Sequence, residues 1–559
     1  MLELKRRSRI SRHAASLAVL AGAAAILAPR VPAQTAPCPA GASASAAAGR
    51  CLDRARDRTA ATHASAYLPL GHWAYPIVEY WISTGRIDDL SPFVKPWRRL
   101  DVARAILDIA EGNPHGFERS WIARLETELA PELALLRGDE SANERLELHF
   151  GLAADYYSQT HRDVLRPELD GPFSDGEVFE RMIIDGHGQG GVLAGGFRGE
   201  RNKFFVHDAQ FPGGRVVPEL NLPVFDEGSM RVEEGYAELQ TKYARVFFGR
   251  MYRNWGAPRL LGFLRSNYAY SEEEIGYRLG TGRVFLIGSF ASYSDFQGDT
   301  THYVAIHRLE IRPIDDLMIA VSEAAVHGGP SQNLDFRLVN PVGVWQIARS
   351  DNDPPHNKIG QLDLWWRAGP GFVLYGSLLA DATNEEESCC QLGGSAGFEL
   401  PSLVPGLVIR ANATAIQSLA YRTSLPWEEY SVENIGIGWD KTDLYLATLE
   451  ADWFGPGGLL LRPRLDVQVK GAGDFRSLRP PFDQLPTFPR ILVGDAERTI
   501  RPALAGRWRS TTAAPFDLEW DLGVNFIQDY RNVTGDDRTE FVGTFKVLIE
   551  SPRISALFD

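Results

Sequence analysis

The chain has 559 residues and a formal net charge of −14, and it contains 53 glycines, 28 phenylalanines, 18 tyrosines and 13 tryptophans. The length allows two to four domains, but abundant glycine and aromatic residues favour many strands and turns over helical layers. The acidic balance argues against nucleic acid as a partner, because nucleic acid selects a basic surface.

Residues 1–33 have the pattern of a secretory signal peptide. Basic residues between Lys5 and Arg12 precede the apolar stretch 17–28, and Val31 and Ala33 are suitable small residues for cleavage. The apolar stretch is too short to span a membrane, so we predict a cleaved signal rather than an anchor. Its removal takes away a net +5 and lowers the charge from −14 to −19. No later stretch reaches 18 consecutive apolar residues, so an exported protein of this sequence can be integral to a membrane only as a β-barrel.

Residues 34–66 are small and polar and predict a flexible linker. Apolar residues then recur at helical spacing in three segments of the region 67–140, which predicts a small helical bundle. These residues are Trp73, Ile77, Tyr80, Trp81 and Thr84, then Val102, Ile106 and Ile109, then Trp121, Leu125 and Leu129. Pro131 interrupts the third segment. So small a bundle hardly stands alone, and we expect it to plug the periplasmic mouth of a barrel.

The region 141–559 has the two-residue period of β-strands with one polar face. In 459–470, Leu461, Leu465 and Val467 alternate with charged or amide side chains, and 516–526 alternates in the same way. Similar patterns cover 359–367, 372–381, 405–414 and 541–550. A soluble sandwich also alternates, but strands of about ten residues with aromatic residues at their ends favour an outer-membrane barrel. The fold class predicted is all-β: a closed antiparallel transmembrane β-barrel of about 16–18 strands.

Several short motifs are discounted. The segments 186–191 and 393–397 match a dinucleotide-binding and a nucleophile-elbow pattern, but neither has the required helix, and both are more typical of glycine-rich turns. Asp315-Asp316 is predicted as a turn. Cys38 and Cys51 could form a disulfide, whereas the adjacent Cys389-Cys390 pair has no metal or redox spacing. We expect no cofactor, no metal and no catalytic activity.

Three segments together resemble the Wzi-like family of capsule-assembly outer-membrane proteins. They are GRMYRNWGAPRLLGFLRSNYA (249–269), HRLEIRPIDDLMIAVSEAAVHGG (307–329) and the Asn340-Pro341 pair, and the N-terminal helical segment from Tyr67 is similar as well. The resemblance implies a barrel of about eighteen strands whose periplasmic end is occluded by a helical bundle. It also implies non-enzymatic binding of capsular polysaccharide at the cell surface. The chain ends in SPRISALFD and not on an aromatic residue that closes a strand, as is usual in such barrels. We therefore expect a short tail after a last strand that holds Phe541, Phe545 and Ile549.

The first functional hypothesis is a surface lectin that retains capsular or other surface polysaccharide. Aromatic faces bind sugar rings, and guanidinium, amide and carboxylate groups bind hydroxyls and uronic carboxylates. The candidate binding residues are Arg250, Arg253, Asn254, Trp255, Asn267, Arg308, Glu310, Glu323, Gln361 and Asp363. The alternative for each is a structural ion-pair network in the barrel interior, or an interface position for Trp255.

The second hypothesis is a porin-like channel for anionic solutes, with Arg462 and Arg464 on its inner face. An enzyme inside the barrel is a weaker third hypothesis, since no nucleophile–base pair supports it. The expected partners are surface polysaccharide and outer-membrane lipids, with the protein a monomer in the bacterial outer membrane.

Overall fold

The structure is a computed structural model in which residues 1–55, with the predicted signal peptide, and all four cysteines lie outside the described part. The described residues are 56–112, 114, 116–158, 177–202, 221–223, 229–269, 271–294, 301–330, 336–340, 357–369, 371–382, 391–432, 435–480, 491–510, 516–551 and 554–557.

The N-terminal part of the described chain is helical. It contains α3 (Tyr75–Ser83), α4 (Arg99–Glu111), α5 (Glu118–Glu128) and α6 (Ala130–Leu136), followed by the 3₁₀ turn η1 (Glu140–Asn143). The third predicted helix is therefore two helices, divided at Leu129, where the backbone leaves the helical region ahead of Pro131. The predicted apolar faces are buried: Trp81, Ile106 and Leu125 are fully enclosed.

The described end of the predicted linker forms regular structure. Residues 56–62 are helical, and Ala64, Ser65 and Ala66 are fully buried. Arg98 explains the difference, because its guanidinium donates to the carbonyls of Ala60 (3.0 Å) and His63 (3.2 Å). The small side chains that suggested a linker instead allow close packing against α4.

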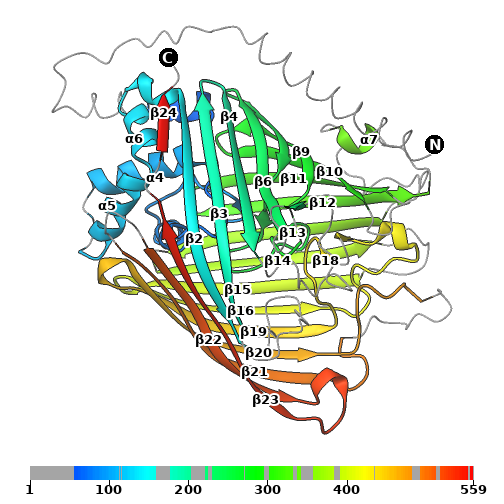
Figure 1. The fold of residues 1–559 in the computed structure, drawn as a ribbon. Coiled ribbons are helices and arrows are strands. Elements are labelled where there is room, and N and C mark those ends of the chain that lie inside the picture. Colours follow the sequence, from blue (N-terminus) through cyan, green and yellow to red (C-terminus); the bar gives the residue numbers. More distant parts are fainter. Residues whose placement is uncertain are drawn as a thin grey trace. The chain divides into compact units, whose positions relative to one another are not determined.

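The strands close one antiparallel barrel (Figure 1). Among the described residues the closed barrel contains twenty labelled strands, but β5 continues β7 along β6 and β24 continues β23 along β2. The wall of the barrel therefore has eighteen strand positions around the interior, which we call the lumen. The predicted fold class is confirmed. The barrel strands are β2 (Arg145–Tyr157), β3 (Glu177–Gly190), β4 (Leu193–Asn202), β5 (Asn221–Pro223), β6 (Ser229–Gln240), β7 (Ala244–Arg250), β9 (Glu273–Thr281), β10 (Val284–Ser294), β11 (Thr301–Ile314), β12 (Leu317–Gly329), β13 (Asn357–Gly369), β14 (Phe372–Ala382), β15 (Gln391–Val404), β16 (Leu407–Ile416), β19 (Leu444–Phe454), β20 (Leu459–Lys470), β21 (Glu497–Arg509), β22 (Phe516–Gln528), β23 (Arg538–Glu550) and β24 (Ile554–Leu557).

Further short elements lie outside the barrel wall. They are β1 (Val94–Lys95) paired with β8 (Asn254–Trp255), β17 (Ser431–Val432) paired with β18 (Ile435–Gly436), α7 (Phe336–Val339), and the 3₁₀ turns η4 (Pro426–Glu428), η5 (Pro456–Gly458) and η7 (Tyr530–Asn532).

Burial along the strands is the reverse of that in a soluble sandwich. In β20, Leu465 is 40 % exposed and Val467 is 37 % exposed, whereas Asp466 between them is fully buried. A soluble protein would bury the apolar face, because that face gains most from leaving water. Apolar side chains outside and charged side chains inside suit a barrel surrounded by lipid, so this pattern decides between the two predicted β architectures.

The two ends of the barrel differ in their connections. At one end the strands are joined by turns of two or three residues, as at 282–283, 315–316 and 405–406. At the other end the connections are long, as at 251–272, 417–443 and 471–496. Asp315 and Asp316 form a turn, as predicted. Outer-membrane barrels have short periplasmic turns and longer extracellular loops, so we expect the short-turn end to face the periplasm.

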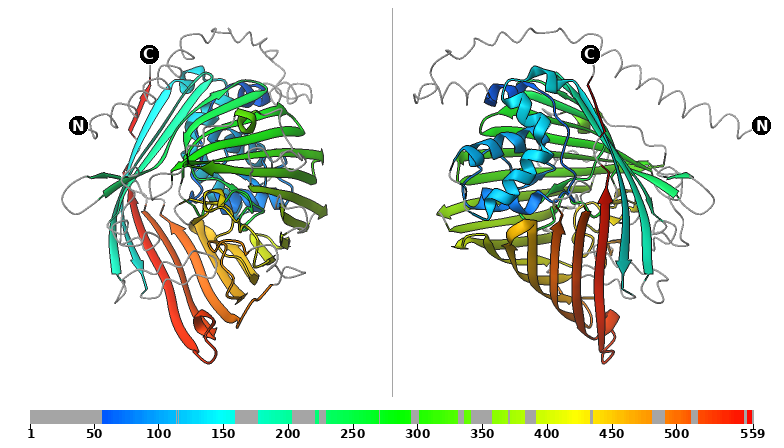
Figure 2. Two further views of the ribbon diagram at one scale, coloured as in Figure 1. Left: turned by 90° about the vertical axis from the view of Figure 1, so that its right-hand side faces the viewer. Right: turned by 60° about the vertical axis from the view of Figure 1, so that its left-hand side comes forward.

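The helical bundle contacts the short-turn end at several points around the barrel (Figure 2). Arg98 donates to Gln240 at the end of β6 (3.1 Å), Arg367 of β13 donates to the carbonyl of Ile82 (3.0 Å), and Arg124 donates to the carbonyl of Gly457 (2.6 Å). One hydrophobic cluster continues from helix residues such as Trp121 to barrel residues such as Phe454. The barrel is therefore the packing partner that so small a bundle requires.

The two glycine-rich motifs lie in strands and not in turns, so that part of the prediction is wrong. Residues 186–190 belong to β3, which β4 follows without a helix, and residues 393–397 belong to β15. A Cβ atom at Gly397 would lie 2.6 Å from the ring of Tyr375 on the neighbouring strand. Glycine at this position lets an aromatic ring lie across the sheet, which is a packing function that a turn signal does not reveal.

The expected C-terminal tail is not free. Phe541, Phe545 and Ile549 lie in β23 with exposed side chains, as predicted. Beyond them, however, the chain forms β24, in which Leu557 pairs with Arg145 and Ile554 with Leu148. The tail completes the pairing of the first half of β2, which would otherwise present an open edge.

Because all strands pair in a closed ring, we expect the folded protein to resist unfolding by detergent. Boiled and unboiled samples should migrate differently on a denaturing gel, and the protein should fractionate with the outer membrane in a form that lacks residues 1–33. Equal mobility together with recovery in the soluble periplasm would contradict the barrel.

Candidate functional site

The connection between β7 and β9 folds into the lumen, and we call residues 251–269 the inner loop. Its contacts reach widely separated strands: Leu264 donates to Gln361 of β13 (3.0 Å), and Arg259 donates to Glu450 of β19 (3.3 Å). Within the inner loop, β8 pairs with β1 of the N-terminal region, with Trp255 opposite Val94. The lumen is therefore filled from both ends, and the two fillings meet in a short antiparallel sheet.

The inner loop owes its shape to local hydrogen bonds. The side chain of Asn254 donates to the carbonyl of Leu260 (3.0 Å) and accepts from the amide of Gly262 (2.9 Å). A Cβ at Gly256 would lie 2.5 Å from the nitrogen of Gly262, so only glycine allows this approach. Trp255 is 2 % exposed and packs in the lumen, which excludes an interface position for it.

A buried carboxylate ties the inner loop to the barrel wall. Glu274 of β9 binds Arg253 and also lies 3.2 Å from Arg265, and Ser289 of β10 donates to it. Arg265 in turn donates to the hydroxyl of Tyr293 (2.9 Å). Glu274 was not among the predicted site residues, because one glutamate at a strand start gives no signal of the two arginines that the fold brings to it.

The predicted residues on β11, β12 and β13 form an ion-pair network. Arg308 binds Asp363, donates to Ser322 (3.1 Å) and lies 3.7 Å from Glu310. Gln361 donates to Asp363 (2.7 Å). Arg308, Glu310 and Asp363 are fully buried.

Glu323 is also buried and lies 3.3 Å from His307. Among the ten predicted binding residues, Asn267 is exposed, and Arg250 is half-buried and paired with the exposed Glu273 (2.8 Å). Arg253 and Asn254 are also half-buried. The burial of the remaining six supports the structural alternative that the sequence left open, and the role of all ten in polysaccharide binding stays a prediction.

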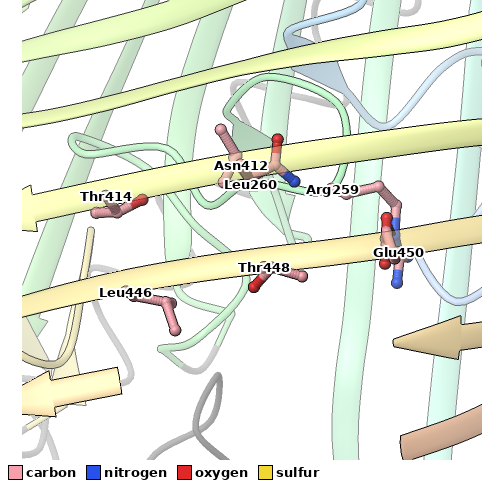
Figure 3. Close-up of a pocket in the computed structure, with 7 residues that line it drawn as sticks. All are labelled: Arg259, Leu260, Asn412, Thr414, Leu446, Thr448 and Glu450. Atoms are coloured by element: carbon pink, nitrogen blue, oxygen red, sulfur yellow. Dashed lines mark hydrogen bonds and ion pairs between the residues drawn. The ribbon is translucent and has the colours of Figure 1, made fainter. Parts of the chain in front are cut away.

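A pocket that the sequence did not single out lies beside the inner loop (Figure 3). It has about 330 Å³ of empty space, part of it open to solvent. Its lining residues are Arg259, Leu260, Asn412, Thr414, Leu446, Thr448 and Glu450. Asn412 and Thr414 come from β16, and the last three come from the neighbouring β19. This space includes open solvent, so the pocket is a small recess between the inner loop and the barrel wall.

The pocket has the chemistry to bind hydroxyl groups. Arg259 has a left-handed backbone (φ 63°) that directs its side chain to Glu450, and this side chain is still 31 % exposed. Glu450 also lies 3.8 Å from Arg410 and 3.9 Å from Arg462, so several arginines hold it in place. Guanidinium, amide, hydroxyl and carboxylate groups around Leu260 and Leu446 are the mixture that an amphipathic sugar ring requires. The only signal of this pocket in the sequence is the alternation of polar residues along two strands that face the lumen.

The bundle contributes a buried ion pair below this region, between Glu79 of α3 and Lys95 of β1. Burial alone would raise the pKa of Glu79, but the Lys95 ammonium and the Arg410 guanidinium outweigh it and hold that pKa below its usual range. Within the described residues no group of histidine, cysteine, aspartate and glutamate side chains is arranged to hold a metal ion. In the same part of the chain no helix is long and apolar enough to cross a membrane.

The sequence of residues 189–414 matches the family model described as capsule assembly protein Wzi. The resemblance to the Wzi family is confirmed. One similar solved structure is that of Wzi from Escherichia coli, described as an outer-membrane protein involved in group 1 capsule assembly and as a carbohydrate-binding β-barrel. It shares 12 % identity, the match covers 88 % of this chain and 99 % of that one, and the TM-score is 0.59.

At that identity the Wzi match establishes the barrel fold. A BenF-like porin from Pseudomonas fluorescens Pf-5 is 10 % identical over 74 % of this chain and 99 % of its own, with a TM-score of 0.42, which is too low to support an argument. No curated protein sequence matches this chain.

Proposed function

We propose that the protein is a non-enzymatic outer-membrane component of capsule assembly that binds and retains surface polysaccharide. The observation that carries the proposal is the polar pocket beside Arg259, in a lumen that the helical bundle and the inner loop fill from opposite ends. The Wzi-family match supports the same function, as does the description of the Escherichia coli protein as carbohydrate-binding. The expected partners remain surface polysaccharide and lipid, with the protein acting as a monomer.

The helical bundle is proposed to be the periplasmic plug of this barrel. It contacts the short-turn end, and short turns face the periplasm in proteins of this class. The pocket and the long connections are then nearer the cell surface, where a retained polymer is located.

The alternative of an anion channel receives less support. Arg462 and Arg464 were predicted to line the inner face of the channel. Arg462 binds Asp452, and Arg464 lies 2.8 Å from Asp466. Arginines that are neutralised by neighbouring carboxylates do not form the continuous basic surface that an anion path needs.

The proposal predicts that Arg259→Gln weakens polysaccharide binding. Removal of a hydrogen bond to a charged group costs about 1.5–3 kcal/mol, which is at least a tenfold loss of affinity. Binding of the purified protein to a glycan array would identify the ligand, and titration of that ligand would measure the loss. Arg283→Gln is the matched control, because this exposed arginine is in the short turn after β9 and pairs with Asp315 (2.9 Å). Equal affinities for wild type and Arg259→Gln would reject the pocket as the binding site.

A further inference from the structure

A second group of basic residues lies at the other end of the lumen, beside the bundle. Arg245 of β7 is directly opposite Arg278 of β9, so both side chains point to the same face of the sheet. Arg312, near the end of β11, is at the same short-turn end and donates to the carbonyl of Asp88 (2.6 Å). We call these three residues the arginine cluster.

The arginine cluster shares its carboxylate partners with other arginines. Like charges directly opposite each other on neighbouring strands repel, so the Arg245–Arg278 pair costs stability unless an anion lies near it. Arg245 is 3.9 Å from Asp101 of α4, and Arg312 is 3.7 Å from Glu310. Both carboxylates are shared, because Asp101 also binds Arg98 and Glu310 also lies 3.7 Å from Arg308.

Asp89 is a further carboxylate that interacts with Arg312. With Glu238, which interacts with Arg98, four carboxylates face the four guanidinium groups of Arg98 and the arginine cluster, so no carboxylate is left over for an individual arginine.

Arg278 is the clearest sign of a missing partner. Among the described residues no carboxylate lies within 4.0 Å of it, and its Nε atom is buried without a hydrogen-bond acceptor. Its guanidinium carbon lies 3.8 Å from the ring centre of Phe285, so the ring fixes one face. The side chain is half-buried, as is that of Arg245. A planar guanidinium with one face fixed and its edge free is suited to bidentate binding of an oxyanion.

We propose that the arginine cluster is a binding site for the oxyanion of an acidic ligand that enters from the short-turn end. The chemistry is that of a carboxylate or a phosphate group, as carried by a uronic acid or by a phosphorylated sugar. This site is separate from the pocket at Arg259 and does not depend on the function of that pocket. An acidic protein attracts no anion at long range, so recognition of an acidic ligand needs a local cation without a carboxylate partner, which Arg278 provides.

The test uses the full-length protein in detergent and two probes, trigalacturonate and inorganic phosphate, titrated calorimetrically at low and high salt. We expect at least one probe to bind, with an affinity that falls as salt rises. Arg278→Gln should weaken that binding about tenfold or more, the effect of losing a hydrogen bond to a charged group. Arg278→Lys, which keeps the charge and loses the planar fork, should give an intermediate affinity. Arg283→Gln, which removes a paired arginine in the adjacent turn, should bind like wild type.

The two probes distinguish the source of the oxyanion: preference for trigalacturonate assigns a uronic acid, and preference for phosphate assigns a phosphorylated ligand. Absence of binding by both probes, or equal binding by wild type and a correctly folded Arg278→Gln, would overturn the proposal. Heat-modifiable migration on a gel verifies that each variant is folded.

Discussion

A variant without residues 35–138 should assemble as a barrel and conduct ions, but less than an open barrel of eighteen strands. Its strands pair without help from the helices, and lumen side chains are polar enough to tolerate water. The inner loop remains, and it is held to the wall by Glu274 and Gln361. We therefore expect a second, larger rise in conductance when residues 252–269 are also replaced by a short Gly/Ser linker. Single-channel recordings in planar bilayers measure both steps, with the nearly silent full-length protein as the reference.

The matched control is the full-length protein in which only residues 252–269 are replaced. Because the bundle still covers the short-turn end, this variant should stay nearly silent. Full conductance after removal of the helices alone would show that the inner loop leaves the lumen once β1, its pairing partner, is lost. Unchanged conductance in all variants would show that other segments close the barrel.

The strands were predictable from the sequence because the alternation is a local property. In β20 the order of Arg464, Asp466 and Gln468 against Leu465 and Val467 specifies two faces without reference to the rest of the chain. The same holds for the apolar faces of α3, α4 and α5. The inner loop was not predictable in this way. Its conformation depends on Gln361 and Glu450, which are about 100 and 190 residues away in the chain and give no signal within the loop itself.

The residue types of the candidate site were predictable, but their accessibility was not. Arg308 and Asp363 have the right chemistry for a sugar, and the sequence placed them in the lumen. It could not show that they bind each other, because their pairing requires the register of β11, β12 and β13. Arg259 was overlooked since its position depends on a left-handed turn and on Glu450 across the lumen. Pairing within the barrel thus determines which polar residues remain available to a ligand.

Glu274→Gln should loosen the inner loop more than any single change to its arginines. The variant leaves Arg253 and Arg265 buried without their carboxylate, and loss of one partner from a buried ion pair costs about 3–5 kcal/mol. Arg253→Gln should cost less, about 1.5–3 kcal/mol, because Glu274 keeps Arg265 and Ser289. Arg250→Gln should cost under about 1 kcal/mol, since its partner Glu273 is exposed. Hydrogen exchange of peptides from residues 251–269 measures these opening free energies.

The same three variants separate the two interpretations of the inner-loop arginines. If Arg250 and Arg253 bind an acidic polymer directly, Glu274→Gln removes a competing negative charge and should preserve or strengthen capsule retention, while Arg250→Gln should weaken it. If the arginines are structural, retention should follow the opening free energies: lost in Glu274→Gln, reduced in Arg253→Gln and unchanged in Arg250→Gln. The buried position of Glu274, and the fact that the inner loop supplies Arg259 and Leu260 to the pocket, favour the second order. Retention that falls in Arg250→Gln and persists in Glu274→Gln would restore these arginines as direct ligands of the polysaccharide.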